Sequence, residues 1–227
     1  MRRIVIVSAL TLSVAASALA ASPAVKHTKA GNAKAAASIL TKKNLGSVWT
    51  ATKSNASGVH FTCTGFSPSG KGITETGAAG SPAYSTSAPY AGITQTTSVF
   101  GSAKQASRLW SRAMKPGLFT CLSNIVGALK SRGITTKVSG EARLAGGKTL
   151  GAPYTGFRIT LTSVKPVAGR KIIFDVVFVR FGAAISEITF TSFTSPIPAK
   201  VQQAITTLVA HNLGARGSAP APSAPIA

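Results

Sequence analysis

The chain has 227 residues, of which 44% are hydrophobic, so it is long and apolar enough to form one domain with a core. It carries 25 Lys and Arg but only four acids, Glu75, Glu141, Asp175 and Glu187. Because 13% of the residues are charged, the chain is poor in acids and does not have the composition of a dense basic tail. Such a protein attracts polyanions such as nucleic acid, acidic cell-wall polymer or anionic lipid; the alternative is a basic surface without a specific partner.

Residues 1–20 have the features of a secretory signal peptide. Arg2 and Arg3 precede an apolar run from Ile4 to Leu19, and Ala18-Leu19-Ala20 predicts cleavage after Ala20. An uncleaved anchor is the alternative, but about 16 apolar residues are few for a membrane span. We therefore expect an exported protein, secreted into the cell envelope, with no transmembrane span in its mature form.

The chain divides by composition into a linker, one globular domain and a tail. Residues 21–36, rich in Ala, Ser, Lys and Gly, predict a flexible linker, and the domain is expected over 37–214. A short helix is predicted from Ala35 to Lys43. Residues 215–227, rich in Pro, Ala and Ser, predict a disordered tail. Ser67 to Pro89, rich in Gly, Ser, Thr and Pro, predicts a long surface loop or part of a binding site.

Two consecutive helices are predicted in the middle of the chain. The first spans Ser102 to Met114, where Ser102 is a suitable N-cap and apolar residues recur at helical spacing. The second follows Pro116-Gly117 and ends at Gly133. Opposite the apolar face of the first helix lie four cations: Lys104, Arg108, Arg112 and Lys115. They are a candidate anion-binding site, and a solvated helix face is the alternative.

The only cysteines are Cys63 and Cys121. In an oxidising compartment two cysteines predict one disulfide; two buried thiols or a catalytic thiol are the alternatives. Closing a loop of about 58 residues would stabilise the fold by about 4 kcal/mol.

Strands are predicted on both sides of these helices. Ile93 to Phe100 and Ile134 to Leu144 read as strands, with a turn at Gly146-Gly147. Thr155 to Phe193 predicts three consecutive antiparallel strands. The second of them, Lys171 to Phe181, is apolar on both faces and must be covered on both sides.

An amphipathic helix, Ala199 to Asn212, is predicted to close the domain. The predicted fold class is therefore α+β: an antiparallel sheet with a three-strand C-terminal meander, packed by amphipathic helices.

Several short motifs, taken in order, resemble a known family. They are Leu40, Leu45-Gly46 and Trp49; Phe61-Thr62-Cys63; Val99-Phe100-Gly101-Ser102 with Ala106 and Trp110; Leu118 and Cys121-Leu122; and Phe178-Val179-Arg180-Phe181-Gly182. Over about 37–214 the chain resembles the extracellular sensor-type domain of actinobacterial (mycobacterial) serine/threonine kinases and related secreted proteins and lipoproteins. The resemblance implies an α+β domain with a cleft, stabilised by disulfide bonding, that binds small or cell-envelope ligands. The chain contains no kinase domain, so the signalling role is not carried over, and the second disulfide of other members has no counterpart.

The few acids and the histidines, His27, His60 and His211, show no metal-ligand spacing and no paired carboxylates. No G-x-S-x-G or G-x-x-x-x-G-K motif occurs. We therefore predict no catalysis, no metal and no cofactor. Asp175, inside an apolar strand, is a candidate contact in a ligand cleft; the alternative is an ion pair with Arg158 or Arg180. Glu187 is expected to face solvent.

These observations predict a secreted, non-catalytic binding or sensor-like domain of the bacterial cell envelope. Its partner would be a small envelope ligand in a cleft or an anionic envelope polymer on the basic surface. One alternative is a basic structural or adhesive protein that holds anionic polymer or lipid, and a second is a hydrolase with a site around Asp175 and His60. Nucleic acid is not expected, because the chain is exported and its aromatic residues are not interleaved with the basic ones.

Overall fold

The computed structural model describes residues 22–63, 65–87, 90–123, 135–165, 169–193 and 195–215. Three predictions lie outside these residues: the signal peptide over 1–20, the end of the second helix near Gly133, and the tail beyond Ala215. Ala215 itself is buried in the core, where its N–H donates to the carbonyl of Ala210.

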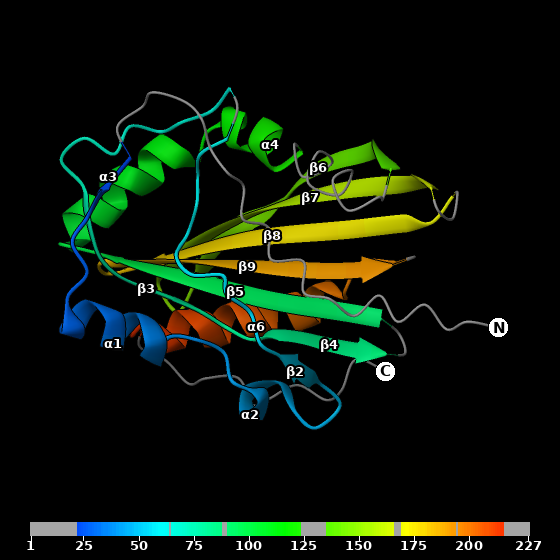
Figure 1. The fold of residues 1–227 in the computed structure, drawn as a ribbon, viewed down its shortest axis with the longest axis horizontal. Coiled ribbons are helices and arrows are strands. Elements are labelled where there is room, and N and C mark those ends of the chain that lie inside the picture. Colours follow the sequence, from blue (N-terminus) through cyan, green and yellow to red (C-terminus); the bar gives the residue numbers. More distant parts are fainter. Residues whose placement is uncertain are drawn as a thin grey trace.

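A nine-stranded, mostly antiparallel sheet organises the described part of the chain (Figure 1). The strand order is β1-β3-β5-β9-β8-β7-β6, and β4 pairs with β5 and with β2. Its strands are β1 (Ala24–Val25), β2 (Thr50–Thr52), β3 (Thr74–Gly80), β4 (Ala83–Ser87), β5 (Tyr90–Phe100), β6 (Thr135–Thr149), β7 (Ala152–Lys165), β8 (Lys171–Phe181) and β9 (Ala184–Phe193). The last four strands pair in chain order, β6 with β7, β7 with β8 and β8 with β9, and each pair is antiparallel.

Helices cover both faces of this sheet. They are α1 (Lys29–Ala37), α2 (Lys42–Leu45), α3 (Ala103–Ala113), α4 (Pro116–Ser123) and α6 (Ala199–Asn212). One hydrophobic core joins the sheet to α1, α2 and α6, and a second joins it to α3 and α4. In Figure 1, α6 passes behind the sheet.

Strand β8 is the centre of both cores. Val177 and Val179 belong to the core beneath α6, whereas Val176 and Phe178 belong to the core beneath α3. Side chains alternate between the two faces of a strand, so a strand that is covered on both faces must be apolar at nearly every position. The sequence prediction that Lys171–Phe181 is covered on both sides is confirmed, because eight consecutive residues of β8 are buried.

The two clearest predicted helices are present. In α3 the hydroxyl of Ser102 caps the N-terminus by accepting from the Gln105 N–H, as its N-cap role predicted. The last helix, α6, has the predicted bounds. The predicted disulfide joins Cys63 to Cys121 and so links the segment before β3 to α4.

The prediction of a flexible linker over residues 21–36 is wrong for the described part of that segment. Strand β1 pairs with β3, and α1, which begins after the N-cap Thr28, packs on β3. The Gly-rich and Ala-rich composition serves close packing instead: a side chain on Gly31 would collide with the carbonyl of Thr76, and one on Gly77 would collide with the backbone of Gly31. The predicted helix Ala35–Lys43 is correspondingly replaced by the end of α1 and by α2.

The long loop predicted over Ser67–Pro89 is also wrong, because β3 and β4 lie within it. Its small residues again permit close approach, since a side chain on Gly80 would collide with the carbonyl of Ala56. The turn predicted at Gly146-Gly147 lies inside β6, and the chain reverses at Leu150-Gly151, where both φ angles are positive, 50° and 78°.

The first prediction concerns the contact between α1 and β3. Gly77→Ala should lower the free energy of unfolding by about 1–3 kcal/mol, because the added methyl group overpacks a site already filled by the backbone of Gly31. Urea unfolding followed by circular dichroism measures the change. Gly92→Ala, in β5, is the matched control, because its methyl group would meet Thr191 at an ordinary contact distance of 3.5 Å. Equal effects of the two variants would contradict this account of the packing.

Candidate functional site

The four cations predicted as an anion-binding stripe do not play equal parts in the structure. Lys104, Arg108 and Lys115 are exposed on or just beyond α3. Arg112 is half-buried, and its Nη1 donates to the carbonyls of Ser69 (2.7 Å) and Lys71 (3.1 Å). The guanidinium of Arg112 therefore holds a neighbouring segment of the chain against α3.

That segment, residues 69–74, lies along α3. Gln105 accepts from the Thr74 N–H at 2.9 Å, and Arg108 Nη1 lies beside Gly72, 3.4 Å from the position that a Cβ would occupy. The segment brings one further exposed cation, Lys71, to the helix. We call the exposed set the α3 patch: Lys71, Lys104, Arg108 and Lys115. Sequence spacing did not place Lys71 there, because it lies in a stretch that was predicted to be a loop.

Asp175 does not face a cleft. It is 1% exposed, and its carboxylate accepts from Arg158 Nε (2.6 Å), Arg158 Nη2 (2.8 Å) and Gln202 Nε2 (2.6 Å). The hydrogen bond to Asp175 raises the pKa of Arg158. Because Gln202 belongs to α6, this cluster fastens the helix to the sheet. Of the two readings of Asp175, the ion pair with Arg158 is confirmed.

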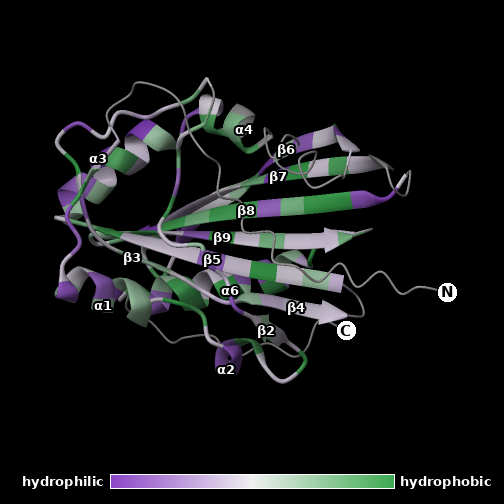
Figure 2. Cartoon of the chain, viewed as in Figure 1, coloured by the Kyte–Doolittle hydropathy of each residue, from purple (hydrophilic) through white to green (hydrophobic). Residues whose placement is uncertain are grey.

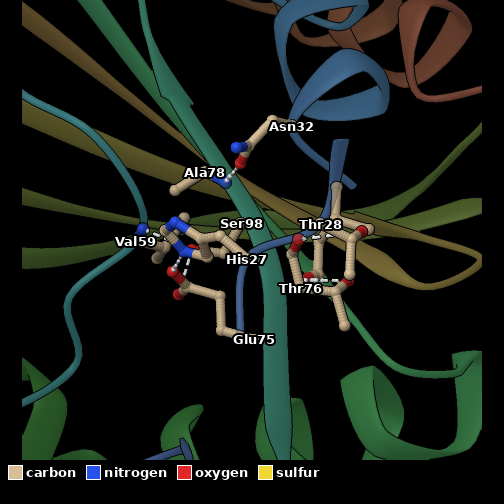
Figure 3. Close-up of polar contacts among 9 residues, drawn as sticks. His27, Thr28, Asn32, Val59, Glu75, Thr76, Ala78 and Ser98 are labelled. Carbon is tan, nitrogen blue, oxygen red and sulfur yellow. Dashed lines mark hydrogen bonds and ion pairs between the residues drawn. The ribbon is translucent and has the colours of Figure 1, made fainter. Parts of the chain in front are cut away.

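Glu75, on β3, lies in a second polar cluster (Figure 3). One carboxylate oxygen is 2.8 Å from His27 Nε2, and the other accepts from the Ser98 hydroxyl at 2.9 Å. The Ser98 hydroxyl in turn accepts from the Val59 N–H at 2.8 Å. Although histidine, serine and carboxylate meet here, the carboxylate lies between the other two, so His27 is not placed to take a proton from Ser98. The cluster holds the N-terminal segment and the segment around Val59 against the sheet.

Glu187, predicted to face solvent, is half-buried on β9. It lies between Thr96 on β5 and Phe178 on β8, and Phe61 stacks on Phe178 with ring centroids 5.4 Å apart. Burial raises the pKa of Glu187 to about 7, against a weak opposing effect of the 3.5 Å hydrogen bond from Thr189.

Three of the four acidic side chains are thus buried or half-buried. In the described part of the chain, sixteen Lys and Arg residues are exposed, whereas Glu141 is the one exposed acid. The outer surface is therefore strongly cationic.

The residues of the hydrolase hypothesis do not come together. Phe61, next to His60, packs on Phe178, and strand alternation places Phe178 and Asp175 on opposite faces of the sheet. His60 and His211 are exposed. Among the described residues no group of three or more His, Cys, Asp or Glu is arranged to hold a metal ion.

Comparison with protein-family models, with curated proteins and with solved structures gives no match for this chain. None of the helices formed by the described residues has both the length and the apolar composition needed to cross a membrane.

The second prediction concerns Asp175. Asp175→Asn should lower the free energy of unfolding by about 2–3 kcal/mol, because it leaves the half-buried Arg158 without its carboxylate. Thermal unfolding measures the loss. The double variant Asp175→Leu with Arg158→Leu is the control and should lose less than the single variant, since it removes both charges together. A single variant as stable as the wild type would contradict this role.

The third prediction concerns the pH dependence of stability. The folded protein holds a proton on Glu187 up to about pH 7, whereas the unfolded chain loses it near the ordinary value of 4.5. The folded state therefore binds more protons between these values, and the free energy of unfolding falls as pH rises through that window.

Glu187→Gln removes this loss. The variant should match the wild type near pH 4 and exceed its free energy of unfolding by about 1–2 kcal/mol at pH 8, allowing for the partial exposure of the residue. Urea titrations across the pH range measure the difference. Parallel stability curves for the two proteins would contradict the burial of this carboxyl group.

Proposed function

We propose that this protein is an exported, non-catalytic, sensor-like binding domain of the bacterial cell envelope, and that it binds an anionic envelope polymer through the α3 patch. The signal-peptide pattern at residues 1–20 and the disulfide between Cys63 and Cys121 support export. The family that the sequence resembles supports a ligand-binding role.

One observation carries the proposal: the sixteen exposed cations against one exposed acid in the described part of the chain. Surface charges of one sign add up to a field that attracts polyanions and raises their association rate. Most exposed Lys and Arg have no carboxylate to pair with, because Asp175 and Glu75 bind partners inside the fold. These cations are therefore available to the ligand.

The backbone that carries the α3 patch is fixed by packing and by hydrogen bonds. Ala106, Leu109 and Ala113 fix the opposite face of α3 in the core, and Arg112 fixes the segment that carries Lys71. Lys104 and Arg108 are one helical step of four residues apart, about 6 Å along the axis. Because the backbone beneath these cations is fixed, contact with successive anionic groups of a polymer needs to order only their side chains.

The structure offers little for catalysis in the described residues. The Asp175 carboxylate accepts from Arg158 and Gln202, and the Ser98 hydroxyl donates to Glu75, which separates it from His27. These contacts support a binding role over the hydrolase alternative.

The fourth prediction tests the α3 patch. The variant Lys71→Gln, Lys104→Gln, Arg108→Gln, Lys115→Gln should bind polyphosphate and polygalacturonate at least about tenfold more weakly than the wild type, with a shallower dependence on salt. Arg112 stays unchanged, because its loss would release residues 69–74. The measurement is titration of the mature protein over a NaCl series, with phosphatidylglycerol liposomes as a third ligand.

The matched control removes four exposed cations elsewhere: Lys29→Gln, Lys34→Gln, Lys42→Gln, Lys43→Gln on α1 and α2. It has the same net charge as the test variant and should lose no more than about threefold. Equal losses in both variants would show that total charge holds the polymer and would favour the adhesive alternative. If the protein bound liposomes more tightly than either polymer, the proposed ligand would be an anionic lipid and not a polymer.

A further inference from the structure

A second surface, on the side of the sheet that carries α3, differs sharply from the cationic remainder. Gln95 and Thr97 of β5 turn toward α1 and the segment after it, where they bond to Ser38 and Leu40. Alternation therefore turns Thr94 and Thr96 to the opposite face. The segment that carries Val59 and Phe61 does not enclose this face, and the side chains of Thr94 and Thr96 are half-buried.

Strand pairing extends this pattern over four strands. Thr189 of β9 is opposite Thr94, Thr191 is opposite Gly92, and Gly92 is opposite Ser85 of β4. Thr52 of β2 is opposite Ala83, which shares the face of Ser85. We call this the hydroxyl face: Thr52, Ser85, Thr94, Thr96, Thr189 and Thr191. In Figure 2, β4 and β9 are largely pale, of intermediate hydropathy, whereas β8 is largely green.

The hydroxyl groups on this face are available to a ligand. Those of Thr94, Thr96 and Thr191 make no side-chain hydrogen bond to any described residue, and that of Thr189 makes only the 3.5 Å contact with Glu187. Neighbouring strands are about 4.8 Å apart, and successive residues on one face are about 6.8 Å apart. The face is therefore a lattice of groups that each donate and accept hydrogen bonds.

Cations are absent from the described positions of this face. The chain exposes sixteen Lys and Arg elsewhere, yet β4, β5 and β9 contain none, and Lys53 follows β2. Glu187 is the one ionisable group among the hydroxyl positions of β9. By contrast, other strands of the same sheet carry exposed lysines, namely Lys137 and Lys148 on β6 and Lys171 on β8. A neutral face on this protein suits a neutral ligand and does not suit a polyanion.

An aromatic pair forms one end of the face. The rings of Tyr90 on β5 and Phe193 on β9 are 4.6 Å apart between centroids, and Phe193 is 37% exposed. Burial raises the pKa of Tyr90, so its hydroxyl stays a neutral donor. Aromatic rings supply apolar area against which the C–H face of a sugar ring can pack.

From this geometry we infer that the hydroxyl face binds a neutral, extended polysaccharide chain. Such a chain presents hydroxyl groups along both edges and C–H surfaces above and below each ring, which match the threonine lattice and the Tyr90–Phe193 pair. A face four strands wide suits an extended chain rather than a compact small molecule. The site is separate from the α3 patch and does not rest on the function proposed for that patch.

The fifth prediction tests the hydroxyl face with cellohexaose and chitohexaose as probes. The mature protein, with its disulfide intact, should bind at least one of them with an affinity that changes little between low and high NaCl. Thr94→Val with Thr189→Val keeps the shape of both side chains and removes two hydroxyl groups, so binding should weaken at least about tenfold. Phe193→Ala should weaken binding independently of the hydroxyl groups.

Two controls separate this site from others. Thr160→Val changes a half-buried strand threonine on the face toward α6, and it should bind within about twofold of the wild type. The four-residue α3 patch variant should also bind both oligosaccharides unchanged, so this prediction can fail without the polymer prediction failing. Isothermal calorimetry measures affinity, and circular dichroism verifies folding of each variant. Absence of binding to both probes, undiminished binding by the double valine variant, or binding lost with salt and with the α3 patch would each overturn the inference.

Discussion

The sheet and the helices behind it depend on the buried side chain of Gln95. Its Oε1 accepts from the Leu40 N–H at 2.7 Å, and its Nε2 donates to the Ser38 carbonyl at 3.1 Å and the Ser186 hydroxyl at 2.9 Å. One amide thereby joins the end of α1, β5 and β9. A buried amide without hydrogen-bond partners destabilises the fold by more than each bond contributes when it is made. A shift of α1 along the sheet would leave the Gln95 amide without these partners, so the observed position of the helix is favoured over shifted ones. Asp175 does the same for α6, through Arg158 and Gln202.

Internal use of the acids determines the character of the surface. With four carboxylates in the chain, each one that bonds inside the fold leaves surface cations without a partner. Glu75 and Asp175 hold the N-terminal segment and α6, and their side chains are 16% and 2% exposed. The same contacts that stabilise the fold therefore produce the cationic exterior. The neutral hydroxyl face stands out against that exterior because the sheet positions that form it bear no Lys or Arg.

Periodicity predicted the elements whose stability comes from large apolar side chains. The double-sided burial of β8, the amphipathic α3 and α6, and the disulfide all follow from residue type and spacing. Sequence reasoning failed where the packing depends on small residues. Gly31 and Gly77 bring two backbones together, and no local pattern distinguishes that use of glycine from a flexible linker. The hydroxyl face was missed because Ser85 lies in the stretch predicted as a loop, and because pairing brings together strands that are far apart in sequence.

One covalent link joins two segments that lie next to the candidate surfaces. Cys63 ends the described segment that carries Val59 and Phe61, which covers Phe178 and borders the hydroxyl face at Glu187. Cys121 lies in α4, which follows α3 after the helix break at Met114 and Lys115. Phe66, close to Cys63, fills the space left by Gly117 in α4, so apolar packing reinforces the bond. The disulfide and this packing thus join the segment beside the neutral hydroxyl face to the helix that follows α3, and a bond of this kind persists in an oxidising compartment.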